Sequence, residues 1–553
     1  MTTSFVLEGR FVDVFEQRIK VGKLRIDNGK ILAFEECGSS SSALYMPGFV
    51  DAHIHVESSL LVPTEFARLA LPHGTIATVS DPHEIGNVLG VKGVLYMLKN
   101  AENTPLKIYF GAPSCVPATS AALETAGAEI SSEEIAQLLD RDDIGYLAEV
   151  MNFPGVLNAD KAVMSKIQAA LHRNKPIDGH FPGGRGEDAK RYIEAGYPEQ
   201  TTISTDHECF SLEEAIDKLE YGMKISIREG SAARNLEALH PLFEKVSADR
   251  LMLCSDDRHP DTLIKGHINE LARRLVQKGY DPLKVITSAT RTAVEHYRLN
   301  VGLLRPGDPA DCIKVRDLES FHVEETYIDG KLVARDGTCL VPSSPIEIVN
   351  NFSCSPIALG DIEQNGESTS IRVIDVLDGE IVTRSGEGVV TSHGGKLVSD
   401  TTTDILKLVV VNRYTASPPA IAFVRGFQLK HGALASSVGH DCHNIIAVGV
   451  SDKDIVAAVN EIVEKKGGLS IADGENRQIL PLPVAGIMSD LPGEEVAELY
   501  TALDENAKKL GSPLRAPYMS LSFLALLVIP ELKLSDKGLF DGRTFQFTSL
   551  ELK

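Results

Sequence analysis

Eight strand-like segments alternate with helix-like segments through the first half of this 553-residue chain. The apolar runs lie at 49–56, 75–81, 106–114, 144–151, 176–180, 201–206, 224–229 and 251–256. The segments between them, such as PTEFARLALPH, KAVMSKIQAALHR and LEEAIDKLEYGM, repeat apolar residues at helical spacing. Strands that alternate with helices form parallel sheets, and eight such units over roughly 250 residues predict an α/β fold with a (β/α)8 TIM-type barrel.

Residues that bind metals stand where these apolar runs end. Two histidines two residues apart, in FVDAHIHVESS, point to the same side of a strand and can share one metal ion. Further candidates end the fourth, fifth, sixth and eighth runs, and a TIM-type barrel keeps its active site at those strand ends. The predicted metal ligands are His53, His55, Glu149, His180, His207 and Asp256.

The residue types suit a two-metal hydrolytic site. A carboxylate at Glu149 can offer one oxygen to each of two cations, and neutral imidazoles at His180 and His207 can complete the second. Asp256 can contact one metal ion and accept a proton from its water, although the neighbouring Asp257 is a competing candidate. Nitrogen and oxygen ligands suit manganese, iron or zinc, and we expect two divalent ions, with Mn2+ or Fe2+ favoured and Zn2+ as a further option.

Several motifs resemble the adenine deaminase branch of the amidohydrolase superfamily, and the resemblance covers essentially the whole chain. They are MPGFVDAHIHVESS (46–59), TVSDPHEIGNV (78–88), AEVMNFPGV (148–156), DGHFPG (178–183), STDHE (204–208), IREGSA (227–232), SDDRHP (255–260) and LKHGALASSVGHDCHNIIAVG (429–449). Many superfamily members carry a carboxylated lysine at the end of strand four, and glutamate at that position is itself a mark of this branch.

The resemblance implies a reaction. A hydroxide that bridges two metal ions would attack C6 of adenine, Asp256 would move its proton toward the departing amine, and the products would be hypoxanthine and ammonia, as in purine salvage. The alternative is another binuclear amidohydrolase that acts on a cyclic amide or an aminopurine, because fold and ligands fix the chemistry better than the substrate. A non-enzymatic scaffold is disfavoured because all six ligand positions are filled.

Five further residues are candidates for the pocket. Asp81, His83 and Glu84 end strand two, where they could protonate the ring, hold an outer metal ion or bind a purine edge; a capped turn is the alternative. We assign His83 and Glu84 catalytic roles and Asp81 a substrate-binding role. Arg228 and Glu229 end strand seven and are predicted to bind substrate, with an ion pair at the barrel rim as the alternative.

A short motif far down the chain has two interpretations. GHDCHN places His440, Asp441 and His443 within four residues. Such a group could reach the barrel mouth or form an accessory metal site, but a turn or a capped helix start is slightly favoured.

Periodicity also predicts the flanking units. Residues 1–45 and 300–343 alternate apolar and polar residues around the turns at Asn28-Gly29 and Asp329-Gly330, so we expect them to form one small β-sandwich with the barrel, 46–299, inserted between them. Residues 344–553 mix strand-like and helix-like segments and predict a C-terminal α+β domain.

Charge and cysteine content limit the binding partners and the cellular compartment that we expect. The net charge of −22 argues against nucleic acid or an anionic membrane as a partner. Eight cysteines without CxxC pairs favour reduced thiols, and the N-terminus lacks a signal-peptide layout, so we expect a cytoplasmic protein whose partners are adenine and water. A homodimer is the default expectation for assembly.

Overall fold

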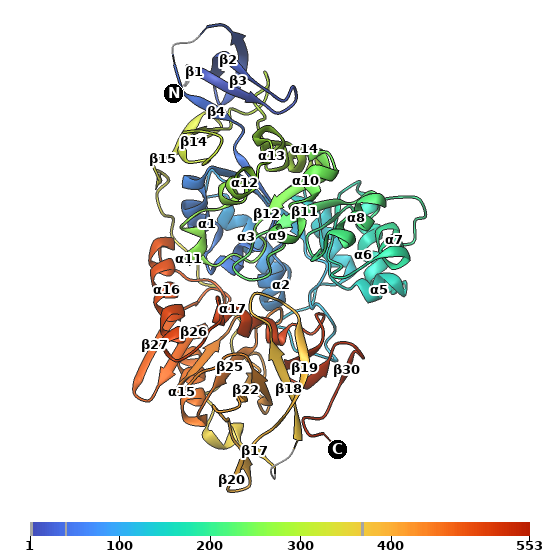
Figure 1. Cartoon of the computed structure of the whole chain (residues 1–553), viewed down its shortest axis with the longest axis vertical. Coiled ribbons are helices and arrows are strands. Elements are labelled where there is room, and N and C mark those ends of the chain that lie inside the picture. Colours follow the sequence, from blue (N-terminus) through green and yellow to red (C-terminus); the bar gives the residue numbers. More distant parts are fainter. Residues whose placement is uncertain (1–3, 39–40, 367–369, 553) are drawn as a thin grey trace.

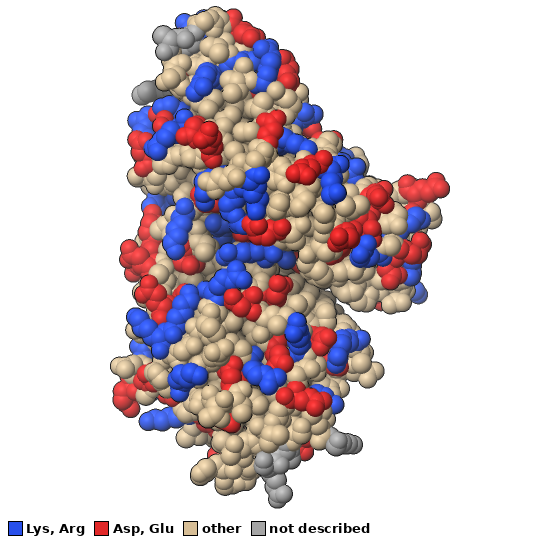
Figure 2. Space-filling model, in the orientation of Figure 1, with Lys and Arg blue, Asp and Glu red and all other residues tan. Residues whose placement is uncertain are grey.

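The computed structural model describes residues 4–38, 41–366 and 370–552. Three units follow one another along the long axis of the molecule: a β unit that contains the N-terminus, the barrel, and a C-terminal unit (Figure 1). Acidic and basic side chains are interspersed over the face shown in Figure 2. Among the described residues, none of the helices combines the length and apolar character needed to span a bilayer.

The first unit is one eight-stranded sheet built from both ends of the barrel segment. Its strands are β1 (Ser4–Asp13), β2 (Arg18–Asp27), β3 (Lys30–Glu36), β4 (Leu44–Met46), β13 (Cys312–Val315), β14 (Val323–Ile328), β15 (Lys331–Arg335) and β16 (Thr338–Cys339). The amide of Ile31 in the edge strand β3 donates to the carbonyl of Asp308, 3.0 Å away, so the sheet curls back toward β13. Leu7, Leu24 and Cys312 belong to the apolar cluster inside this curl.

Both predicted hairpin turns of this sheet are confirmed. Asn28 and Gly29 have φ of 49° and 79° between β2 and β3, and Asp329 and Gly330 have φ of 46° and 70° between β14 and β15. A two-residue turn with both φ values positive matches the twist of the flanking strands, which is why Asn-Gly and Asp-Gly recur there.

The barrel contains the eight predicted strands in sequence order. They are β5 (Phe49–Ile54), β6 (Thr75–Ser80), β7 (Lys107–Ala112), β8 (Ile144–Val150), β9 (Ile177–Gly179), β10 (Thr205–Asp206), β11 (Lys224–Arg228) and β12 (Leu251–Cys254). Each pairs in parallel with its neighbours. The amide of Asp256 donates to the carbonyl of His53, 2.9 Å away, and closes the last strand onto the first.

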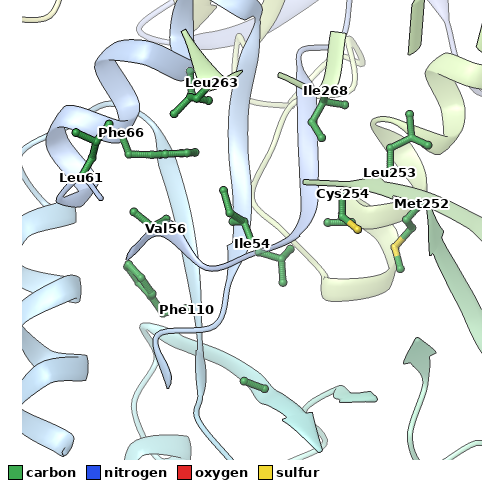
Figure 3. Packing of buried hydrophobic residues seen from close by; sticks show 14 of the residues in the cluster. Ile54, Val56, Leu61, Phe66, Phe110, Met252, Leu253, Cys254, Leu263 and Ile268 are labelled. Carbon is green, nitrogen blue, oxygen red and sulfur yellow. The ribbon is translucent and has the colours of Figure 1, made fainter. Parts of the chain in front are cut away.

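Helices cover the outside of this barrel. They are α1 (Pro63–Ala70), α2 (His83–Leu89), α3 (Val91–Ala101), α4 (Ser132–Leu139), α5 (Phe153–Leu157), α6 (Lys161–His172), α7 (Gly186–Glu194), α8 (Leu212–Glu220), α9 (Leu236–Leu239), α10 (Leu242–Lys245), α11 (Pro260–Leu263), α12 (Ile268–Gln277), α13 (Pro282–Ser288) and α14 (Arg291–Tyr297). Ile54, Phe110 and Leu253 of the strands belong to one buried apolar cluster with Phe66 of α1 and Ile268 of α12 (Figure 3). Each such buried side chain contributes about 1.5–3 kcal/mol, which fixes the strand ends in place.

The C-terminal unit combines a mixed sheet with two long helices. The sheet order is β19-β18-β23-β22-β25-β24-β26-β27. Its strands are β18 (Ser370–Val376), β19 (Thr383–Val389), β22 (Leu406–Val411), β23 (Ala420–Arg425), β24 (Ala433–Ser436), β25 (Ile445–Gly449), β26 (Gly468–Asp473) and β27 (Asn476–Pro481). The two long helices are α15 (Asp452–Lys465) and α16 (Gly493–Lys509), and a short helix, α17 (Pro517–Ser522), follows them. Short strands complete the unit: β17 (Gln364–Asn365), β20 (Ser392–His393), β21 (Lys396–Leu397), β28 (Leu532–Ser535), β29 (Gly538–Asp541) and β30 (Gln546–Phe547).

Hydrogen bonds join this unit to the barrel loop after β7. The side chain of Asn444 donates to the carbonyl of Thr125, 2.9 Å away, and Asp536 accepts from both the amide and the hydroxyl of Thr125, at 3.0 and 2.6 Å. The C-terminal unit therefore packs against the mouth of the barrel. The α+β character that the sequence predicts for it is confirmed, whereas the residue limits of the three units stay predictions.

Candidate active site

Glu149, the second-to-last residue of strand β8, lies between two pairs of imidazoles. Its Oε1 lies 3.3 Å from Nε2 of His55 and 3.9 Å from Nε2 of His53. Its Oε2 lies 2.6 Å from Nδ1 of His180 and 3.4 Å from Nε2 of His207. Each carboxylate oxygen thus faces one pair, which is the arrangement expected of a carboxylate that bridges two cations.

Asp256 faces the first pair. Its Oδ1 lies 3.2 Å from Nε2 of His55 and 3.5 Å from Nε2 of His53, and these two nitrogens are 3.3 Å apart. Asp256 has a φ of 52°, which is uncommon for a residue other than glycine and is often found at functional sites. The structure brings all six predicted ligands together.

The donor set fits divalent cations. Nitrogen and carboxylate oxygen atoms converge within a few ångströms in a buried place, where charged groups need partners. Burial alone would raise the pKa of Glu149, but His180, His207 and His55 around it lower that pKa well below its usual range. A carboxylate that stays ionised in this setting is available to bind metal.

Asp257 lies beside the six predicted ligands, but its carboxylate faces Ser58. Its Oδ1 accepts from the hydroxyl of Ser58, 2.5 Å away. Burial, together with the charge of Asp256, raises the pKa of Asp257 to about 6. Of the two carboxylates that the sequence left open, Asp256 is therefore the one that faces the histidines.

Arg228 connects Asp256 to a residue that the sequence analysis did not single out. Its Nη1 donates to Oδ2 of Asp256 at 2.7 Å and also contacts Glu208, whose Oε2 accepts from Nη2 at 3.0 Å. Glu208 Oε1 in turn lies 3.4 Å from Nε2 of His207. The STDHE motif contains Glu208, and its position next to His207 at a strand end was the available signal.

Glu229 does not line the site. Its carboxylate pairs with Arg274 of α12, and it lies outside the cavity between the barrel and the C-terminal unit. Of the two interpretations of Glu229, the structure favours the ion pair at the barrel rim over substrate binding. Arg228, in contrast, lines the cavity, although its guanidinium group is engaged by two carboxylates.

The SDPHE segment forms the side of the site next to α2. Nδ1 of His83 lies 3.1 Å from Oδ2 of Asp81 and 3.5 Å from Oε1 of Glu149. The carbonyl of Asp81 lies 3.1 Å from Nδ1 of His55 and can accept from it. His83 and Glu84 line the cavity, so both residues are within reach of a molecule bound there.

The C-terminal GHDCHN segment forms a turn, and the turn reaches the barrel mouth. Nδ1 of His440 lies 2.7 Å from Oε1 of Glu84, and Nε2 of His443 lies 2.5 Å from its Oε2. Asp441 Oδ1 lies 3.9 Å from Nε2 of His83. The two interpretations of this motif are thus compatible, because a turn places His440 and Asp441 in the cavity wall and His443 against Glu84.

One small cavity at the barrel mouth is lined by polar groups of the site: His55, His83, Glu84, Glu149, His180, His207, Glu208, Arg228, Asp256, Asp257, His440 and Asp441. Ile381, Phe523 and Leu526 of the C-terminal unit supply an apolar wall. The polar walls come mostly from the barrel, and His440 and Asp441 are added from the C-terminal unit. A small cavity with an apolar wall and a few convergent polar groups is typical of a site for a small, flat molecule.

Comparisons with known proteins cover the whole chain. Residues 44–333 match the model of the amidohydrolase family, and residues 380–546 match the model of the adenine deaminase C-terminal domain. The chain is 51% identical over 551 residues to an adenine deaminase from Salinibacter ruber, with 99% of each chain covered. It is 49% identical over 555 residues to an adenine deaminase from Methanosarcina mazei, with 98% of each covered.

The chain belongs to the adenine deaminase family. One family model matches the barrel together with part of its flanking sheet, and the other matches most of the C-terminal unit. The resemblance that the motifs indicate is therefore confirmed. Members of the amidohydrolase family use divalent metal ions, and the buried histidine and carboxylate cluster at the barrel mouth suits them.

Proposed function

We propose that this chain is a hydrolase that deaminates adenine to hypoxanthine and ammonia with two divalent metal ions. The observation that carries the proposal is the position of Glu149, with one imidazole pair on each carboxylate oxygen. Relatives of 43–51% identity that span the chain bear the name adenine deaminase, which supports the choice of substrate.

His53, His55 and Asp256 would hold one ion, His180 and His207 the other, and Glu149 both. Bound metal ions would supply Lewis acidity, which lowers the pKa of water from near 16 to roughly 7 and makes a nucleophile available at neutral pH. Manganese or iron is the proposed native metal, with zinc as the alternative that the same donors accept.

Asp256 is the proposed proton carrier. Arg228 fixes its Oδ2, while its Oδ1 faces His53 and His55, so the carboxylate has a defined orientation toward the reacting atoms. Burial favours its neutral form, but Arg228 and the two histidines outweigh that effect and hold its pKa well below the usual range. The carboxylate is therefore ionised and ready to accept the proton that water releases.

His83 and Glu84 are the proposed contacts to the purine ring. Asp81, which the sequence suggested as a third contact, lies outside the cavity, where its Oδ2 is 3.1 Å from Nδ1 of His83 and can orient that imidazole. A ring nitrogen next to C6 must gain a proton as the tetrahedral carbon forms, and Glu84 and His83 are the cavity-lining groups that can provide it. Ile381 and Phe523 would cover the flat faces of the ring and exclude water.

A substrate panel tests the proposal. The purified chain, reconstituted with Mn2+ or Fe2+, should release ammonia from adenine with the accompanying change in ultraviolet absorbance. Turnover of a cyclic amide without turnover of adenine would overturn the proposal and favour the alternative amidohydrolase. A cytoplasmic location and a dimer stay predictions from the sequence, which fraction-specific detection and light scattering can test.

A further inference from the structure

Glu84 is held from the opposite end of the chain. It lies in the first turn of α2, is 2% exposed, and lines the cavity. Its two carboxylate oxygens meet two different imidazoles, His440 at 2.7 Å and His443 at 2.5 Å. Both imidazoles come from the C-terminal unit, whereas the barrel's own His83 lies farther away, at 3.6 Å. The orientation of Glu84 therefore depends on the C-terminal unit.

The turn that carries these imidazoles is fixed in several ways. The amide of His440 donates to the carbonyl of Ser522, and its ring packs 5.1 Å from the ring of Phe523. The hydroxyl of Tyr414 donates to the carbonyl of Cys442, 2.6 Å away. A Cβ added at Gly439 would lie 2.7 Å from the carbonyl oxygen of Asn444, so the turn requires glycine at this place. Such a turn can hold another side chain in one orientation.

We infer that His440 and His443 are positioning residues, which fix the carboxyl group of Glu84 against the bound purine. This inference rests on the proposed function, in which Glu84 contacts the ring. Free glutamate side chains populate several rotamers, and two imidazoles that face its two carboxylate oxygens select one of them. The C-terminal unit is thus part of the active site, and a barrel with a complete metal site still needs it for efficient turnover.

Isosteric variants distinguish the polar contact to Glu84 from the volume that each histidine side chain fills. The amide nitrogen of asparagine takes the place of a histidine Nδ1, and that of glutamine takes the place of Nε2. His440→Asn and His443→Gln should therefore retain most activity, because they keep a donor toward Glu84. His440→Leu and His443→Leu should lower kcat by about tenfold to a hundredfold, the size of effect expected when a buried charged group loses a polar partner. His431→Leu, at an exposed histidine of the same unit, is the matched control and should have wild-type kcat.

The decisive measurement is a double-mutant cycle with Glu84→Gln. If both histidines act through Glu84, His443→Leu should lower kcat much less in the Glu84→Gln background than in the wild type. In that background the carboxylate that His443 orients has already been replaced. Metal content and melting temperature, measured on the same samples, should match those of the wild type. Additive losses in the cycle would overturn the inference.

Two other results would overturn it as well. A loss of bound metal in His440→Leu or His443→Leu would make these residues ligands of a further ion instead of positioning residues. Equal activity of the leucine and the isosteric variants would mean that the contact to Glu84 has no role. Wild-type turnover of adenine in the same assay tests the proposed function separately, and the cycle can be run on whichever substrate the wild type accepts.

Discussion

Lys533, in β28, allows a pH prediction that can be worked from the structure. Its side chain is fully buried, and its Nζ donates to the carbonyl of Ile381 at 2.7 Å and to that of Phe523 at 2.9 Å. Both acceptors belong to residues that line the cavity. Burial lowers the pKa of Lys533 to about 7. The lysine thus links the two segments of the apolar wall while its charged form is disfavoured.

The direction in which pH changes the free energy of unfolding follows from the protons that the folded and unfolded chains bind. An unfolded lysine titrates near pH 10.4, so between pH 7 and 10 the unfolded chain binds a proton that the folded chain lacks. The free energy of unfolding of the wild type should therefore rise with pH across this window, by roughly 1.4 kcal/mol for each unit. Below pH 7 the folded chain must bury the charged form of Lys533, and this lowers the free energy of unfolding by about 5 kcal/mol in all. Lys533→Met removes this dependence but leaves two buried carbonyls without a donor, at about 1–3 kcal/mol each.

Melting curves of the wild type and Lys533→Met between pH 7.5 and 9.5 test this prediction. One kcal/mol shifts the melting temperature of a domain of about 200 residues by about 2–4 °C, so the wild type should gain about 3–6 °C on the variant for each pH unit. Lys453→Met, at an exposed lysine of α15, should show a constant difference from the wild type and serves as the control. A constant difference for Lys533→Met as well would refute the argument, because Lys533 would then be as easily protonated in the folded chain as in the unfolded one.

Three further predictions concern the metal site and the substrate. Elemental analysis should find two transition-metal ions per chain, and Glu149→Gln should lower that number, because one side chain faces both imidazole pairs; full activity with one ion would contradict this. Asp256→Asn should keep much of the metal but lose about 10²–10⁴-fold in kcat, whereas a larger loss in Asp257→Asn would assign the proton transfer to the neighbour. Adenine should exceed adenosine by roughly 10⁴ in kcat/KM, since a ribose would leave buried polar groups unpaired; comparable values would mean that the cavity is open at N9.

The barrel and its metal ligands could be predicted because both depend on patterns within short stretches of sequence, namely apolar runs and the residue types at their ends. Each strand end carries its own signal, and the register of a parallel barrel places those ends on one rim. His53 and Glu149 are nearly one hundred residues apart, yet the fold class alone brings them together. Glu208 has only a weak signal, its place beside His207 at a strand end, because a glutamate next to a ligand histidine is equally consistent with a solvated loop.

Residues 228 and 229 show that a strand pattern cannot locate the end of a strand to within one residue. Both end the same strand, and the sequence offers the same ion-pair alternative for each. In the structure Arg228 is the last residue of β11 and points toward Asp256, whereas Glu229, one residue later, pairs with Arg274 of a covering helix. Neighbouring residues of a strand face opposite sides, so an error of one residue in the expected strand end exchanges a pocket residue for one on the rim.

The contacts to Glu84 lie beyond any local pattern. The chain between Glu84 and His440 forms most of the barrel and part of the C-terminal unit, so the contact between these two residues depends on how the two units pack. That packing rests on contacts such as Asn444 to Thr125, which carry no recognisable motif. The sequence offered reach to the barrel mouth as one interpretation of GHDCHN, but it could neither decide between that and a simple turn nor name Glu84 as the residue contacted. Identifying that contact requires the structure, and it is here that the arrangement yields a role for the C-terminal unit that variants of His440 and His443 can test.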